Sequence, residues 1–139
     1  MVPPPQPWTA IRPVDPDKTY VAFTSRFSLR SFLRVPAFLR RTPGIRRQVE
    51  AAPGAVGYSL GADLLKLHFH TLSAWEDAES LRAFARAFPH EGARKAFATD
   101  RRAPNIYVQW SVRGADLPLS WEDALARQRA QETGQHQAV

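Results

Sequence analysis

The chain has 139 residues, of which 44% are hydrophobic and 23% are charged, a balance typical of one globular domain with a single core. It contains no cysteine, which excludes disulfides, thiolate metal sites and cysteine nucleophiles. The net charge is +6, but the basic residues cluster only at Arg40-Arg41 and Arg46-Arg47, so we expect no nucleic-acid partner.

The sequence offers no membrane or export signal. No apolar run approaches the roughly 18 residues that a membrane helix needs. The first residues, Met1-Val-Pro-Pro-Pro, lack the basic start and apolar run of a signal peptide. We therefore expect a cytoplasmic protein with no membrane partner.

The two ends differ in composition from the middle. Residues 1–18 contain six prolines, which fix the backbone and remove donors, so this segment is predicted to be an extended arm. Residues 131–139 have no apolar period and are predicted to be a flexible tail. A single folded domain is expected over 19–130.

The first half of this domain predicts a strand and then a helix. Residues 20–29 alternate between apolar side chains on one face and a mixed set on the other, which indicates a strand. Residues 31–52 have a helical period, with an expected interruption at Pro43-Gly44. Pro53-Gly54 ends the segment.

A hairpin and a second helix follow. We expect strands at 56–60 and 64–72, joined by a turn at 61–63. Ser73-Ala74-Trp75-Glu76 resembles a capping box, so Trp75 is expected to begin a helix whose apolar stripe runs to Phe88. Pro89 is expected to start another short helix, ending near Ala98.

The last strand is predicted at 105–112, with Ile106, Val108, Trp110 and Val112 on its apolar face. Ser120-Trp121-Glu122-Asp123 indicates a capped C-terminal helix, with Leu119 as its hydrophobic staple. The order β-α-β-β-α-β predicts a ferredoxin-like α+β fold with a four-stranded antiparallel sheet and helices on one face. The other face of the sheet must also be buried, and we expect a second copy of the chain to cover it in a homodimer.

A motif in the second half resembles a known family. Thr71-Leu72-Ser73-Ala74-Trp75-Glu76-Asp77, Leu81-Arg82-Ala83-Phe84 and Pro89-His90 are similar to the signature of spheroidene monooxygenase-like proteins. These are related to the antibiotic-biosynthesis monooxygenases of the dimeric α+β barrel superfamily. Small residues at 52–57 match the entry to the family's hairpin. The resemblance covers roughly residues 20–113.

The resemblance implies a small dimeric monooxygenase of specialised metabolism that encloses a hydrophobic organic substrate between sheet and helices. The superfamily includes oxygenases without a cofactor, haem-degrading enzymes and ligand binders, and spheroidene monooxygenase is associated with haem. Phe84 stands nearest the Trp that haem-degrading members use, and the first strand has no Asn, which argues against haem degradation. His90 does have a counterpart in the family.

His90 is the candidate catalytic residue, as a general base or as the axial ligand if haem is bound. The alternative interpretation is that His90 is a structural histidine that is hydrogen-bonded to a backbone group. Arg94 is a candidate partner for a haem propionate. Trp75 and Phe84 are expected to shape the pocket, although a core role for Trp75 is the competing interpretation. The remaining candidate substrate-binding residues are His68, His70 and Tyr107.

Two further patterns leave alternatives open. His68 and His70 share one strand face, which suits either a metal pair or a polar barrel interior. A polar set is expected on one sheet face, lining either a cleft or a dimer interface: Tyr20, Thr24, Arg26, Ser59, Tyr107, Gln109 and Ser111.

Neither a Gly-rich phosphate loop nor a G-x-S-x-G nucleophile occurs in the sequence, so nicotinamide chemistry and covalent catalysis are not expected. Oxygenation, with haem or with no cofactor, is the favoured chemistry. The alternative is a non-oxidative cyclase, isomerase or ligand-binding protein on the same fold.

Overall fold

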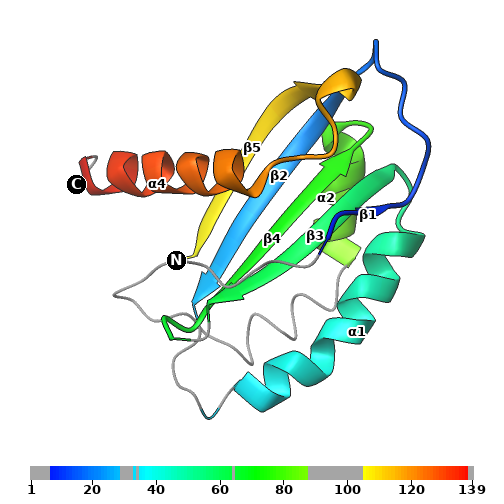
Figure 1. Ribbon diagram of the computed structural model, residues 1–139. Coiled ribbons are helices and arrows are strands. Elements are labelled where there is room, and N and C mark those ends of the chain that lie inside the picture. The colour runs from blue at the N-terminus through cyan, green and yellow to red at the C-terminus, as the bar shows by residue number, and fades with distance from the viewer. Residues whose placement is uncertain (1–6, 29–32, 34, 64, 88–104, 138–139) are drawn as a thin grey trace.

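The computed structural model describes residues 7–28, 33, 35–63, 65–87 and 105–137, and Figure 1 shows their arrangement. The sheet has five antiparallel strands in the order β1-β3-β4-β2-β5. The strands are β1 (Thr9–Ala10), β2 (Thr19–Ser28), β3 (Ala55–Asp63), β4 (His68–Trp75) and β5 (Ile106–Arg113). The helices are α1 (Val35–Ala51), α2 (Ala78–Ala87), the short 3-10 turn η2 (Gly114–Asp116) and α4 (Trp121–Gln137).

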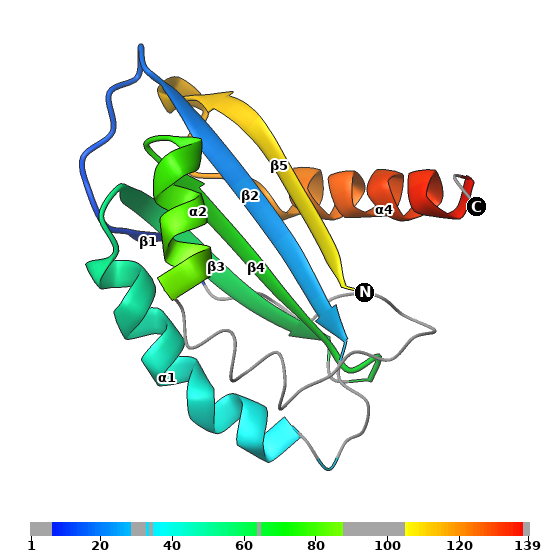
Figure 2. The ribbon, with the colours of Figure 1, turned by 180° about the vertical axis from the view of Figure 1, so that it is seen from behind.

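The elements form three layers. α1 and α2 lie against one face of the sheet, and α4 crosses the other face (Figures 1 and 2). This is a ferredoxin-like α+β arrangement, as predicted. The expected short helix after Pro89 lies outside the described residues. Within the described part of the chain, no helix is long and apolar enough to cross a membrane.

The sheet has one strand more than predicted. Thr9 and Ala10, which lie in the expected extended arm, pair with Tyr58 and Gly57 of β3. The strand is only two residues long because Pro7 and Pro13 stand on either side of it and proline cannot donate to a ladder. The arm therefore extends the sheet, while its other described residues, 7–8 and 11–18, form no helix or strand.

α1 is continuous, whereas the sequence predicted a break at Pro43-Gly44. Pro43 lies inside the helix and is exposed. A proline in this position removes one backbone hydrogen bond, but the packing of Val49 and Ala52 against the sheet core holds the C-terminal part of the helix in place.

The hairpin turn occurs later than predicted. Asp63 pairs with His68, so β3 is longer than expected and the described turn residues are 65–67. The Asp63 carboxylate accepts a hydrogen bond from the Lys66 amide at 3.3 Å, and Leu67 has a positive φ of 57°. Leu65, expected in a strand, is in this turn and is 91% exposed.

The expected capping box before α2 is wrong. Trp75 is the last residue of β4, paired with Val21 and Ala55. The Ser73 hydroxyl accepts a hydrogen bond from Trp75 Nε1 at 2.9 Å instead of capping a helix. Asp77 caps α2, because its Oδ1 accepts the Ser80 amide at 2.7 Å.

α4 begins as predicted but ends later. Ser120 Oγ accepts the Asp123 amide at 3.3 Å, which confirms the N-cap. Leu119 packs against buried Tyr20, Val56 and Ala74. The helix continues to Gln137, so residues 131–137 are helical and not the loose tail expected there.

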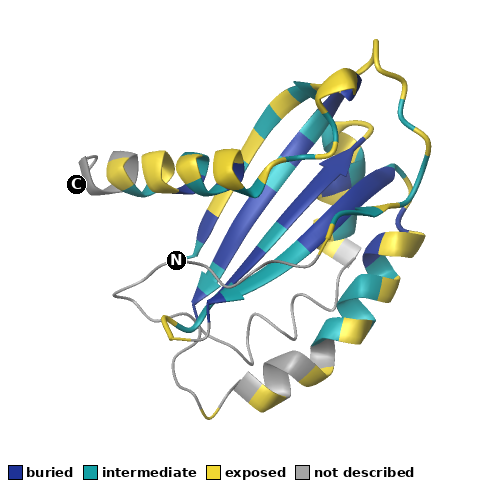
Figure 3. Cartoon of the chain, in the orientation of Figure 1, coloured by how far each residue is buried: buried dark blue, intermediate teal, exposed yellow. Residues whose placement is uncertain are grey.

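Buried residues concentrate in β2, β3 and β4 (Figure 3). One cluster joins the sheet to α1 and α2, and its buried members are Val49, Ala52, Ala55, Tyr58, Trp75 and Leu81. On the other face, Tyr20, Val56 and Ala74 pack with Trp8 and Val14 from the arm and with Leu117 and Leu119. The arm and α4 therefore cover much of the sheet face that was expected to be open for a second copy.

Candidate functional site

The register of the sheet decides which residues share a face. β2 side chains alternate between the helix-side face, against α1 and α2, and the α4-side face. Ser25 stands opposite Thr71 and Tyr107, whereas Arg26 stands opposite His70 and Ile106. Directly opposed residues in antiparallel strands point to the same face.

The polar set predicted for one face is therefore divided between the two. Tyr20, Thr24, Arg26 and Ser59 lie on the α4-side face, and Tyr107, Gln109 and Ser111 lie on the helix-side face. The expectation failed because the apolar side chains of β5 lie on the same sheet face as the mixed apolar and polar side chains of β2. The pairing between β2 and β5 decides which face of one strand joins which face of the other, and the alternation within each strand does not reveal it.

An aromatic surface occupies the helix-side face near β5. The ring of Tyr107 stacks against Phe23 with centroids 6.3 Å apart, and meets the edge of Phe27 at 6.0 Å. Its hydroxyl accepts a hydrogen bond from Asn105 Nδ2 at 3.1 Å. Tyr107 is 44% exposed and the two Phe rings are only half-buried. We name these three residues, Phe23, Phe27 and Tyr107, the aromatic surface.

Two hydroxyl groups lie beside this surface, of which that of Ser25 is buried and that of Thr71 belongs to a partly exposed residue. Ser25 stands between Phe23 and Phe27 on β2, opposite Tyr107, and its Oγ is hydrogen-bonded to Thr71 Oγ1 of β4. Two hydroxyls have two protons and this contact uses one, so the second proton can be donated to a neighbouring oxygen. The face thus combines aromatic contact with a hydrogen-bond donor.

Trp75 and Phe84 lie at the α2 end of the same face. Their ring centroids are 5.1 Å apart. Trp75 is 1% exposed and belongs to the core cluster, whereas Phe84 is only partly buried. Trp75 is thus a core anchor that supports the half-buried Phe84. His90 and Arg94, the candidate catalytic and cofactor-binding residues, lie outside the described residues.

The α4-side face holds a buried polar network centred on Gln128. Gln128 is 3% exposed, and its Nε2 donates to Thr24 Oγ1 at 2.9 Å and to the Ser25 carbonyl at 3.4 Å. Thr24 Oγ1 in turn donates to the Thr71 carbonyl at 2.8 Å. These bonds orient the amide so that its Oε1 faces His70 Nδ1 at 3.2 Å.

The network determines the state of His70. A Gln oxygen only accepts, so His70 Nδ1 must bear the proton that it donates, and Nε2 is the unprotonated nitrogen of the neutral ring. Burial lowers the pKa of His70 to about 4, against a weaker raising effect of Gln128. His70 is therefore neutral near pH 7 and does not serve there as a charged group.

His68 neighbours His70 with ring centroids 6.1 Å apart. Burial, followed by the positive charge of Arg26, lowers its pKa. Both histidines lie on the face opposite Phe84 and Tyr107, so the predicted substrate-binding residues are not brought together. In the described ranges, no group of three or more His, Asp or Glu side chains is placed to hold a metal.

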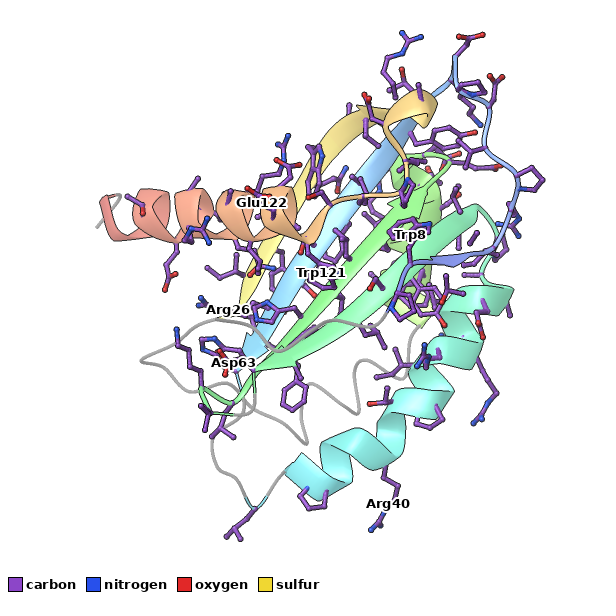
Figure 4. All side chains as sticks on the ribbon, in the orientation of Figure 1. Trp8, Arg26, Arg40, Asp63, Trp121 and Glu122 are labelled. Carbon is purple, nitrogen blue, oxygen red and sulfur yellow. The ribbon has the colours of Figure 1, made fainter. Side chains whose placement is uncertain are left out.

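Several polar contacts join α4 to the sheet, two of them through Trp121 and Arg26, which Figure 4 labels. Trp121 Nε1 donates to Ser59 Oγ at 3.0 Å, and Arg26 forms an ion pair with Glu132 at 3.2 Å. The Arg127 guanidinium lies 4.5 Å from the centre of the Trp110 ring. Gln128 could not be predicted from the sequence, because a glutamine in a polar helix shows no pattern that separates it from a solvated one.

An open cavity of about 380 Å³ lies beside the start of α4. Its lining includes Trp110, Arg113, Leu119, Asp123 and Arg127. The Arg127 and Asp123 side chains, one turn apart on α4, form an ion pair at 3.0 Å. Of the predicted polar set, Ser111 borders this cavity, whereas the candidates His68, His70, Trp75, Phe84 and Tyr107 do not.

No protein-family model matches the chain, and no curated protein matches it. Solved structures do. A monooxygenase from the gene ActVA-Orf6 of Streptomyces coelicolor, in complex with nanaomycin D, is 21% identical with a TM-score of 0.51, and the match covers 76% of this chain and 96% of that one. SnoaB from Streptomyces nogalater, a cofactor-independent oxygenase, is 19% identical with a TM-score of 0.50, covering 72% and 98%.

A dimeric ferredoxin-like protein of unknown function from Thermobifida fusca is 17% identical with a TM-score of 0.54, covering 68% of this chain and 92% of that one. At such identities the likeness shows the fold alone, which is a ferredoxin-like α+β fold. Each of these three proteins is matched over more than nine tenths of its length, so about a quarter or more of this chain has no counterpart in it.

Proposed function

We propose that the protein is a small homodimeric monooxygenase-like enzyme that binds a hydrophobic aromatic substrate on the helix-side face. The observation that carries the proposal is the aromatic surface, half-buried and built around the hydroxyl pair of Ser25 and Thr71. An incoming aromatic ring gains both apolar burial and ring contacts there. The monooxygenases among proteins of similar fold support this class of chemistry.

The arrangement suits a substrate that carries an oxygen on an aromatic ring system. Phe23 and Tyr107 would hold the rings, while the hydroxyl pair donates a hydrogen bond to the substrate oxygen. This donor stabilises negative charge as the oxygen becomes anionic. His90, which the resemblance assigns as a base, would accept the proton in this proposal.

Without a cofactor, such an anion would react with dioxygen directly. A ring carbon that bears two hydrogens becomes a carbonyl carbon. One atom of dioxygen enters the carbonyl, and the other leaves as water with the two hydrogens. The substrate supplies all the electrons, so no outside reductant is needed, and the protein contributes orientation, a proton acceptor and exclusion of water.

The sequence also left open that the enzyme binds haem. The described residues do not form a haem site, because His68 and His70 lie on the α4-side face and His70 Nδ1 is bonded to Gln128. We therefore derive no step through haem. Titration with haemin tests this form of the proposal, since a bound haem would give a shifted Soret band that His90→Ala abolishes.

The substrate site is tested with 1,8-dihydroxyanthrone, whose oxidation to the quinone is followed by absorbance in air-saturated buffer. Thr71→Val removes one hydroxyl at nearly constant volume and should lower kcat/KM about tenfold, a loss typical of one hydrogen bond that strengthens in the transition state. Thr133→Val, at an exposed site of α4, is the matched control and should change nothing.

Three results decide between the alternatives. Saturable turnover that Thr71→Val impairs supports the enzyme. Binding of the anthrone in fluorescence titration without turnover would replace the oxygenase by a ligand-binding protein. Equal behaviour of Thr71→Val and the native chain in both assays would show that the site is not on the helix-side face.

A further inference from the structure

The open cavity beside the start of α4 plays no part in the proposed function. It lies where three elements meet, because its lining comes from β5, from η2 with the segment that follows it, and from the first two turns of α4. Its volume of about 380 Å³ is in the range of sites that hold small organic molecules. The charged side chain that best indicates a ligand there is Arg127.

Two contacts hold the guanidinium of Arg127 in place. Its central carbon lies over the Trp110 ring, 4.5 Å from the ring centre. Its Nε donates a hydrogen bond to the Asp123 carboxylate at 3.0 Å, one turn back along α4. A group that is already positioned loses less conformational entropy when it binds a ligand. Arg127 is therefore oriented at the cavity before a ligand arrives.

The terminal Nη1 and Nη2 groups of Arg127 are available to such a ligand. They make no hydrogen bond to any residue in the described part of the chain. The Arg127 side chain is 41% exposed, so a molecule in the cavity can reach them. The two Nη groups of an arginine match the two oxygens of a carboxylate, and such bidentate pairs are among the stronger hydrogen-bonded contacts in proteins.

The apolar part of the lining suits a flat hydrophobic body next to that carboxylate. Val112 and Leu119 border the cavity and pack against the buried cluster on the α4-side face. Trp110 adds its aromatic ring to the same lining. An aromatic ligand would gain apolar burial and ring contact against these three side chains.

The charges of the lining favour a ligand with a single negative charge. Arg113 and Arg127 are balanced by Asp116 and Asp123, so the lining as a whole is neutral. A polyanion would meet these two carboxylates, and like charges brought together are unfavourable. A monocarboxylate needs only the Nη groups of Arg127. The +6 charge of the whole chain favours the approach of an anion.

We propose that this cavity binds the ionised form of a small aromatic carboxylic acid, with its carboxylate on the Nη groups of Arg127 and its rings against Trp110, Val112 and Leu119. The site is separate from the aromatic surface, because Trp110 lies on the α4-side face of β5 and Tyr107 on the helix-side face. Its occupation does not depend on the proposed oxygenase activity.

The probe is 2-naphthoate, titrated into the whole chain by isothermal titration calorimetry near pH 7. Its uncharged counterpart, 2-naphthamide, should bind at least tenfold more weakly, because it cannot form a charge-assisted pair. Arg127→Gln should raise the Kd of naphthoate at least tenfold. Arg127→Lys should raise it by a smaller factor, since lysine keeps the charge but lacks the paired Nη groups. Arg129→Gln removes an exposed arginine of α4 and, as the matched control, should leave the Kd unchanged.

The indole N–H signals in the NMR spectrum locate the bound ring. The Trp110 signal, assigned by its loss in Trp110→Phe, should shift with naphthoate, whereas the signal of buried Trp75 on the helix-side face should not.

A native chain that does not bind naphthoate would overturn the proposal, and so would equally tight binding of the amide. Binding that Tyr107→Leu weakens and the Arg127 variants leave intact would also overturn it, because the ligand would then lie on the aromatic surface. Circular dichroism confirms that each variant is folded. If Arg127→Gln does not fold, the Kd of Arg127→Lys and the Trp110 signal decide.

Discussion

His70→Asn tests the buried network under α4. Asparagine keeps an N–H group for Gln128 Oε1 but cannot titrate between pH 4 and 7. In the native chain the pKa of His70 is lowered to about 4 from the ordinary 6.5, chiefly by burial. As pH falls below about 6.5 the unfolded chain takes up a proton at this site and the folded chain does not, so folding stability decreases until about pH 4.

The size of this effect follows from the difference in pKa. At about 1.36 kcal/mol per unit, a difference near 2.5 units corresponds to about 3 kcal/mol of stability lost between pH 6.5 and 4. Other groups titrate in the same range, but they are common to both proteins. The free energy of unfolding of His70→Asn relative to the native chain should therefore rise by up to this amount as pH falls.

Urea denaturation followed by tryptophan fluorescence, at several values between about pH 7.5 and 4.5, measures the difference. His68→Asn is the companion variant. Burial and Arg26 also lower the pKa of His68, so it should show a change in the same direction. A stability difference between His70→Asn and the native chain that stays constant with pH would refute the neutral state assigned to buried His70.

Two further predictions concern the backbone turn before β3 and the proposed base. Gly54 has a φ of +83°, and a Cβ there would collide with the Ser80 side chain, so Gly54→Ala should cost about 2–3 kcal/mol in thermal or urea unfolding. Gly44→Ala, inside α1 where a Cβ would only touch the end of the Arg47 side chain at 3.9 Å, should instead add up to about 1 kcal/mol. His90→Ala should abolish turnover or haem binding while the circular dichroism stays native. Retained activity, or an unfolded protein, would contradict that assignment.

Much of the fold could be predicted from the sequence because it depends on local pattern. Alternation over residues 20–29 and 105–112 predicted β2 and β5 to within about one residue, since a strand with one more apolar face shows a period of two. The order of strands and helices then restricted the topology to a ferredoxin-like sheet. Ser120 before Trp121 marked the start of α4, because a side-chain cap is a local interaction.

Local pattern also misled where a distant contact decided the outcome. Pro43 predicted a break, but the packing of Val49 and Ala52 maintains α1. Ser73 resembled a cap, but pairing of β4 with β2 and β3 keeps residues 73–75 extended. In both segments a tertiary interaction outweighed the local preference.

The candidate site depended on tertiary structure most of all. The sequence determined that Phe23, Ser25 and Phe27 share one face of a strand, because side chains alternate along it. Only strand pairing decided that Thr71 and Tyr107 join them, and that His68 and His70 belong to the opposite face. A one-residue difference in register exchanges the two faces, and register is set by contacts between segments nearly fifty or more residues apart.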